Sequence, residues 1–177
     1  KTLNLDLRQY AQMSMFLHAE SVIGQPAVAD GQLTAVIRIG QDFLNNYYEI
    51  RIPLKVTAPS VTATADEIWP VDNNLDFALQ ELVQLKLRRN GQGFPVETIY
   101  REVMGNRTFS VKGNPNIGEV QGFLIGIENE GINPASAEVW VNELRLSGLD
   151  EKGGYAALGR VDMQLADLGT LSVSANT

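Results

Sequence analysis

Short segments in which apolar and polar residues alternate dominate most of the chain. This two-residue period predicts β-strands with one face against a core and the other against water. It is clearest at residues 13–21, 32–40 and 47–56, and strands are also expected at residues 3–7, 107–113, 122–129 and 137–146. The apolar positions of the first three segments are Met13, Met15, Leu17, Ala19, Leu33, Ala35, Ile37, Ile39, Tyr48, Ile50, Ile52 and Leu54.

Turn-forming sequences separate these strands. The stretches ADGQ, DFLNN, NGQG, GNPNIG and NEGINP are rich in Gly, Asn, Asp and Pro, which favour tight turns. Many short strands with such breaks predict a mainly β fold, an antiparallel β-sandwich of the jelly-roll-like kind. The final strand and the opening LDLRQYAQMSMFLHAE also resemble the strands of jelly-roll modules found among carbohydrate-binding domains, a resemblance of fold alone.

One short helix is expected at about residues 79–89. Leu79, Leu82 and Val83 would share one face, and two arginines would lie in the last turn. Gly91 is a candidate C-cap, and Asp76 is an alternative N-cap.

The last strand of the sandwich, VWVNELRL, changes the parity of its apolar positions. Val139 and Val141 are both odd-numbered, whereas Leu144 and Leu146 are even-numbered. A β-bulge inserts one extra residue and would restore a single inward face. We therefore predict a bulge near Asn142.

Composition excludes several classes of function. The net charge is −7 and no basic run occurs, so we expect no nucleic-acid partner. Without cysteine there is no disulfide and no thiolate chemistry. No apolar run of about 18 residues is present for a membrane-spanning helix. The chain opens at Lys1 without methionine, from which we expect a segment of a longer protein.

No motif in the chain predicts an enzyme. His18 is the only histidine, and no GxSxG, SxxK or HExxH sequence accompanies it, so a structural imidazole on one face of a strand is favoured. No cofactor is expected. A structural calcium ion is considered because Asp30, Asp42, Glu138 and Asp150 lie in turns or at strand ends, but no DxDxDG loop occurs.

Aromatic residues offer the only candidate contact site. Tyr47, Trp69 and Tyr100 could stack on sugar rings or meet a protein partner, because aromatic faces suit apolar sugar faces. Packing within the fold is the competing interpretation, for these residues as for Tyr48 and Trp140.

The C-terminal tail follows a stretch rich in Gly and charge. From Tyr155 to Leu165, apolar residues alternate with a more polar set, ADLGT supplies a turn, and the alternation resumes at Leu171. A transmembrane β-strand needs about 9–11 such residues. The tail therefore predicts either the first hairpin of a barrel or an ordinary amphipathic hairpin packed on the sandwich.

The chain resembles the SprA/Sov family, the giant outer-membrane translocons of the type IX secretion system in Bacteroidota. The stretches that carry the resemblance are EVWVNELRL, DEKGGYAA, QLADLGT, YYEIRIPLKV and KLRRN. It implies a piece of a very large single-chain barrel that exports folded cargo and supports gliding motility. It also implies an outer-membrane location, on the periplasmic or extracellular side. The implied partners are the rest of the barrel chain, secretion partners and cargo proteins.

These observations predict two parts. Residues 1–148 would form the jelly-roll-like module, and residues 149–177 would be a linker and the start of a transmembrane hairpin. The module would be a non-catalytic, extramembrane part of the translocon, and the tail could pair with a sheet edge in a dimer of this chain. The alternative function is a carbohydrate-binding jelly-roll module of a surface protein.

Overall fold

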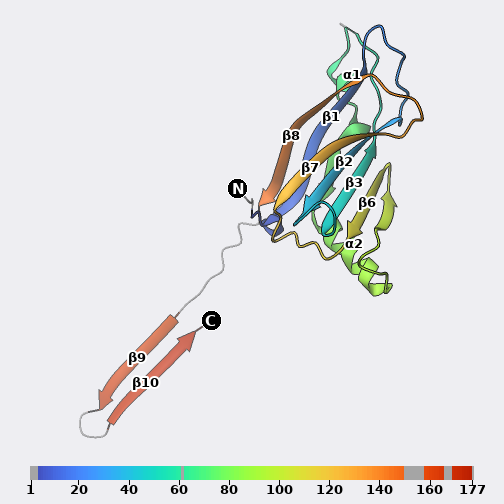
Figure 1. Cartoon of the computed structure of the whole chain (residues 1–177). Coiled ribbons are helices and arrows are strands. Elements are labelled where there is room, and N and C mark those ends of the chain that lie inside the picture. Colours follow the sequence, from blue (N-terminus) through green and yellow to red (C-terminus); the bar gives the residue numbers. More distant parts are fainter. Residues whose placement is uncertain (1–3, 61, 150–157, 166–168, 177) are drawn as a thin grey trace.

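Two antiparallel β-sheets face each other in the computed structural model, which describes residues 4–60, 62–149, 158–165 and 169–176 (Figure 1). One sheet has the strand order β4-β1-β8 and the other β5-β6-β3-β2-β7. Their strands are β1 (Tyr10–Ser21), β2 (Leu33–Gly40), β3 (Tyr47–Pro53), β4 (Leu75–Ala78), β5 (Tyr100–Met104), β6 (Arg107–Lys112), β7 (Gly122–Asn129) and β8 (Ala137–Leu149). The mainly β, sandwich-like fold expected from the alternation is confirmed.

The strands pair in a nested order. β1 pairs with β8, β2 with β7 and β3 with β6, so the chain is folded back on itself around its middle. This is the pairing of a rolled-up hairpin, as in jelly rolls. The middle of the chain departs from it, because β4 pairs with the other edge of β1 and β5 forms a hairpin with β6.

The core lies between the two sheets and is built from the alternating positions. In β1 the inward residues Met13, Met15 and Leu17 are almost fully buried. Phe77 of β4 meets Phe109 of β6 edge to face across the core, with ring centroids 5.4 Å apart. Each strand thus removes one face from water, which is the main favourable term in folding.

The predicted helix is α2 (Gln80–Gly91), with the buried residues Leu82 and Leu85 on its inward face and the buried Leu79 as its N-cap. The proposed N-cap is wrong, because Asp76 lies in β4 opposite Ser14. The proposed C-cap is also wrong.

The helix ends in a Schellman motif. Gly93 has a φ of 65°, its N–H donates to Asn90 O, and the N–H of Phe94 donates to Arg89 O. Glycine is needed at position 93, where the left-handed conformation falls, and not at position 91.

Four elements lie where none was predicted: α1 (Ala65–Ile68), the 3-10 helix η2 (Val71–Asn73), β4 and β5. The β5–β6 turn consists of Gly105 and Asn106, a dipeptide typical of tight hairpins, so a sequence signal was present. The predicted strand at residues 3–7 is absent from the described part of the chain. Only a single bridge joins Leu5 to Val120, before the 3-10 turn η1 (Leu7–Gln9).

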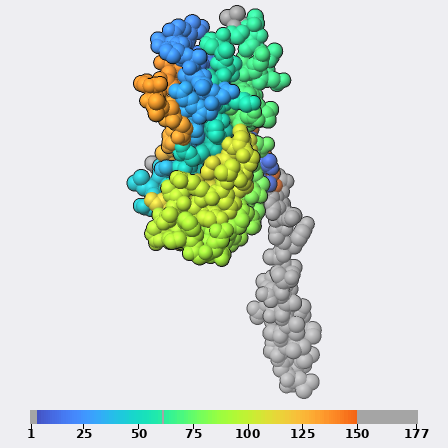
Figure 2. Space-filling model, turned by 90° about the vertical axis from the view of Figure 1, so that its right-hand side faces the viewer, coloured from blue at the N-terminus to red at the C-terminus, as the bar shows by residue number. Residues whose placement is uncertain are grey.

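Helix α2 packs beside the β5–β6 hairpin. Figure 2 shows the two elements as one continuous surface, coloured green and yellow. Arg88 of the helix donates to the Glu102 carboxylate of β5, with N–O distances of 2.8–3.0 Å. Arg89 is fully buried and donates to Gly113 O at 2.6 Å, which anchors the turn after β6.

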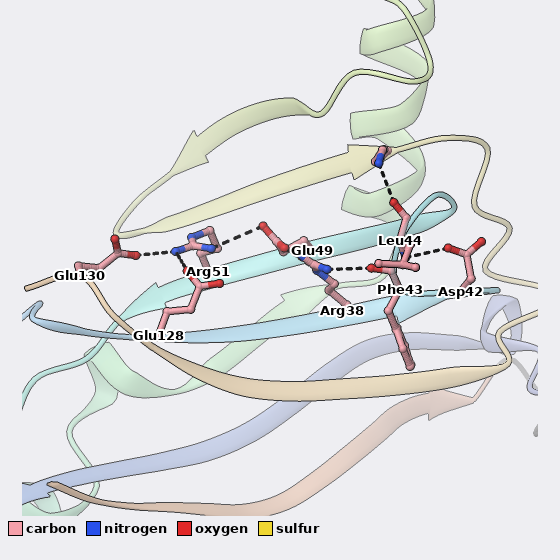
Figure 3. A network of polar contacts seen from close by, with 9 residues as sticks. Arg38, Asp42, Phe43, Leu44, Glu49, Arg51, Glu128 and Glu130 are labelled. Carbon is pink, nitrogen blue, oxygen red and sulfur yellow. Dashed lines mark hydrogen bonds and ion pairs between the residues drawn. The ribbon is translucent and has the colours of Figure 1, made fainter. Parts of the chain in front are cut away.

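A ladder of charges crosses the outer face of the five-stranded sheet (Figure 3). The Glu49 side chain is only 2% exposed, and its carboxylate accepts a hydrogen bond from Arg38 Nε at 2.7 Å. On its other side Arg51 Nη1 lies 3.9 Å away, and Arg51 also binds Glu128 and Glu130. A buried carboxylate is tolerated only when it is paired in this way.

The loop between β2 and β3 is held by Asp42. Its carboxylate accepts hydrogen bonds from the backbone N–H groups of Leu44, Asn45 and Asn46 and from the Asn46 side chain. The backbone N–H of Asn45 is the main reason that the pKa of Asp42 lies well below its usual range. The Asp42 carboxylate therefore stabilises the folded loop through these hydrogen bonds.

Beyond the sandwich, β9 (Leu158–Leu165) and β10 (Gly169–Asn176) pair with each other as a separate two-stranded antiparallel sheet. The predicted tail hairpin is thus present, although residues 155–157 and most of its turn lie outside the described residues. Strand β8 continues to Leu149, which pairs with Tyr10, so it is three residues longer than predicted. Neither helix in the described residues is long and apolar enough to span a membrane.

Replacing Glu49 by glutamine should lower the free energy of unfolding by about 3 kcal/mol, because it removes the buried charge that pairs with the partly buried Arg38 and leaves that guanidinium beside an uncharged partner. Equilibrium urea unfolding of the whole chain measures the change. Glu128→Gln is the matched control. It changes the same ladder at its solvent-exposed end, and it should cost less than about 1 kcal/mol. If both variants lose the same free energy of unfolding, the ladder does not depend on Glu49.

Asp42→Ala should lower the free energy of unfolding at pH 7 by about 1–3 kcal/mol, because three backbone donors lose a charged acceptor. The folded-state pKa is depressed, so this contribution is complete above the unfolded pKa of about 4 and is lost as the pH falls below it. The gap between wild type and variant should therefore shrink between pH 7 and pH 3 in urea titrations. A gap that stays constant would show that the carboxylate charge is not responsible.

Candidate interaction site

An aromatic cluster lies on the outer face of the three-stranded sheet. In β1, Phe16 and His18 point away from the core because they alternate with the buried Leu17. The Trp69 ring lies 6.3 Å from Phe16 and 5.8 Å from His18, measured between centroids. Trp140 of β8, the register partner of His18, lies 5.2 Å from it on the other side.

Trp69 is placed by helix α1. The helix begins with a capping box, in which Thr64 Oγ1 accepts from Glu67 N and Glu67 Oε2 accepts from Thr64 N. It ends at Ile68 with Trp69 as its C-cap, since Pro70 disfavours the helical conformation for the residue before it.

His18 ties this segment to β1. Its side chain is buried, and Nδ1 lies 2.5 Å from Ile68 O. A carbonyl oxygen only accepts, so Nδ1 carries a proton and donates it, while Nε2 lies 3.4 Å from Glu20 Oε2. This agrees with the prediction of a structural histidine on a strand face.

The predicted bulge in the last strand is confirmed beside this cluster. Ser14 pairs with Arg145 and Phe16 pairs with Asn142, so Glu143 and Leu144 together oppose Met15. Glu143 has a φ of 53°, and within the described residues it is the one non-glycine residue with positive φ. The bulge turns this strand so that Glu143 reaches the outer face near Phe16.

A pocket of about 390 Å³ opens between helix α1 and the bulge. Its lining combines two aromatic rings, two carboxylates and two amides with small apolar groups. The lining residues are Phe16, Ala65, Asp66, Trp69, Val71, Asn74, Asn142 and Glu143. A second pocket of about 310 Å³ shares Phe16 and Asn74 with it and continues along β1 to Gln12 and Asp76.

Hydrogen-bond acceptors prevail in this pocket. No lysine or arginine lines it among the described residues, while Asp66 and Glu143 supply two negative charges. Glu143 also forms an ion pair with Arg145, which lies outside the lining. The buried Oδ1 atom of Asn74 has no hydrogen-bond partner in the described part of the chain. The pocket thus suits a ligand that donates hydrogen bonds.

The structure brings only one of the three predicted contact residues to this site. Tyr47 is 2% exposed, on the outer face of the other sheet, with the Arg38 guanidinium 4.4 Å above its ring. Tyr100 is 8% exposed and packs against Phe94 at 5.3 Å. A face that displays Tyr47, Tyr100 and Trp69 side by side, as a flat sugar platform requires, is not formed, because the strands separate the three rings.

Sequence reasoning named Trp69 but missed the other walls of the pocket. The signals existed locally: the outward parity of Phe16, the capping box of α1 and the parity change in β8. What they could not show is that the helix, β1 and the bulge meet, because the elements are far apart in the sequence. The pocket is a product of the β1–β8 pairing.

The carboxylates considered for calcium do not gather. Asp42 is engaged as described, and Asp30 Oδ1 accepts from Val56 N at 2.7 Å. Glu138 lies on β8 opposite Glu20, and Asp150 lies outside the described residues. Within the described ranges, no group of three or more His, Cys, Asp or Glu side chains could hold a metal ion.

A second feature is the open margin of the sandwich between β7 and β8, the edge strands of the two sheets. Ile125 and Val141 have core residues as register partners, yet they are 38% and 44% exposed. The free backbone edges of both strands could accept a further strand.

The comparison with protein families identifies one family. A family model described as motility related/secretion protein, SprA_N, matches residues 1–177, the whole of the sequence. No curated protein matches the chain.

Glu143→Gly should raise the free energy of unfolding by up to about 1 kcal/mol, because glycine adopts positive φ without a steric penalty. The exposed ion pair with Arg145 that it removes contributes little. Glu143→Val, which removes the same pair but is β-branched, should lower stability by about 1 kcal/mol. Urea unfolding of both variants checks the sign, and equal destabilisation would contradict the left-handed backbone at this position.

Proposed function

Because the chain belongs to the SprA_N family of motility related/secretion proteins, we propose that it is a non-catalytic, extramembrane module of an outer-membrane protein-secretion translocon. The machinery would be the type IX secretion system, which also supports gliding motility. Its partners would be the rest of the same barrel chain, other secretion components and cargo proteins.

The pairing of the C-terminal hairpin is the observation that carries this proposal. Val161 pairs with Val173 and Met163 with Leu171, while Asp162 pairs with Ser172 and Gln164 with Thr170. Residues along a strand alternate between two rows, so the sequence predicts one apolar row and one largely polar row for this register. This is the alternation of a barrel strand between lipid and lumen.

The module itself supports a structural role. The side chain of His18 is hydrogen-bonded to a backbone carbonyl, and the features described above are a strand edge and a pocket that suit contacts with another molecule. The sandwich would then stand outside the membrane next to the first hairpin of the barrel.

Of the three contact residues proposed for the alternative, a carbohydrate-binding module, only Trp69 lines a pocket. Tyr47 and Tyr100 are buried, so we favour the secretion role.

The hairpin can be tested with a matched pair in the complete protein in its native host. Val173→Arg places a charge on the apolar face, where arginine at mid-membrane costs about 2–4 kcal/mol. Ser174→Arg puts the same charge one residue later, on the polar face. The first variant should reduce the amount of protein in the outer-membrane fraction and the secretion of cargo, and the second should leave both near wild type. Equal behaviour of the two variants would refute a membrane-embedded hairpin.

A further inference from the structure

We propose that the pocket between α1 and the β8 bulge binds the cationic side chain of a protein partner, an arginine in preference to a lysine. The site is a separate one from the hairpin, and the inference does not depend on the secretion role. It rests on the shape, the lining and the charge of the pocket.

The walls suit a flat cation. Trp69 and Phe16 meet at an interplanar angle of 72°, so they line the pocket with two rings in different orientations. The guanidinium group is planar and weakly hydrated, and it stacks on aromatic faces better than an ammonium group does. Tryptophan is the strongest partner in cation–π contacts.

The charge of the lining has the complementary sign. Asp66 has no hydrogen bond or ion pair within the described structure, which leaves its carboxylate for a ligand. Glu143 shares its carboxylate with Arg145, whose side chain is 60% exposed and can be displaced at little cost. A bound arginine would donate to these carboxylates in the charge-assisted manner that makes such bonds strong.

The amide of Asn74 adds a second polar anchor. Its Oδ1 atom is buried without a donor among the described residues, although the side chain borders both adjoining pockets. An unsatisfied buried acceptor is costly, and a turn of the amide that brings Oδ1 into the pocket would let a ligand donor remove that cost. A guanidinium carries five N–H donors, enough for both carboxylates and the amide.

The neighbouring pocket indicates how the rest of the partner would lie. It extends from Phe16 along β1 and is bordered by Gln12, Ser14, Asp76 and Ser147, again with no basic residue among its lining residues. An extended segment that carries the arginine could follow this path. The partner would then be basic, in keeping with the net charge of −7 of this chain.

The position of Glu143 fits a ligand role. A glycine at the bulge would relax the backbone, yet it would remove one of the two carboxylates. Strained non-glycine residues of this kind cluster at binding sites.

The test is a titration of the whole, isotope-labelled chain with N-acetyl-arginine amide, followed by the indole N–H signal of Trp69 in NMR spectra. N-acetyl-citrulline amide, which has the same shape without the charge, is the matched probe. Arginine should shift the Trp69 signal saturably, at least about tenfold more tightly than citrulline, since one charge-assisted contact contributes about a factor of ten. Raising the salt concentration should weaken the binding.

Variants locate the binding. Asp66→Asn combined with Glu143→Gln should weaken arginine binding several-fold while the free energy of unfolding stays within about 0.5 kcal/mol, because both side chains are exposed. Glu138→Gln, a carboxylate on the same strand outside the pocket, is the control and should change nothing.

Three results would overturn the proposal. These are equal binding of arginine and citrulline, the absence of any shift of the Trp69 signal, and an undiminished arginine affinity in the double variant. Binding of methyl glucoside or N-acetylglucosamine in place of arginine would assign the pocket to sugars instead. None of these results bears on the hairpin, whose test uses different residues and a different measurement.

Discussion

The pairing of β1 with β8 is the constraint on which the rest of the molecule depends. It joins residues 10–21 to residues 137–149, the two ends of the sandwich, in one antiparallel ladder. Closing a loop of this length costs conformational entropy, and the buried face of β1 offsets that cost. Once β1 and β8 are paired, the chain between them is folded back on itself. The pairs β2–β7 and β3–β6 then lie successively further inside this fold along the chain.

The same ladder decides what the outer surface can do. It sets Trp140 beside His18 and puts the extra residue of β8 next to Phe16. Helix α1 then adds Trp69 from the middle of the chain. The pocket is therefore assembled from three separate parts of the sequence. The aromatic residues Tyr47 and Tyr100 lie elsewhere, and they are buried by packing against their neighbours.

The two sheets differ in how the polar groups on their outer faces are paired. The five-stranded sheet covers its outer face with paired charges around Glu49, which satisfies a carboxylate that is almost removed from water. The three-stranded sheet leaves carboxylates and amides at an open pocket and a free edge at β8. Polar groups that have a hydrogen-bond or ion-pair partner stabilise the module. Polar groups without such a partner mark where the module can bind another molecule.

The periodicity along the chain was enough to predict the strands at β1, β2, β3, β6, β7 and β8, the buried face of β1, β2 and β3, the bulge in β8 and helix α2, because these features depend on neighbours two to four residues apart. Short or weakly patterned elements such as α1, β4 and β5 were missed, since four or five residues carry too little periodicity.

The helix stop was misplaced by two residues, because Gly91 and Gly93 look alike until the backbone conformation is known. Pairing order, the charge ladder and the pocket required the tertiary structure. They depend on which distant strands become neighbours, and that is set by the packing of the whole core and not by any local run of residues.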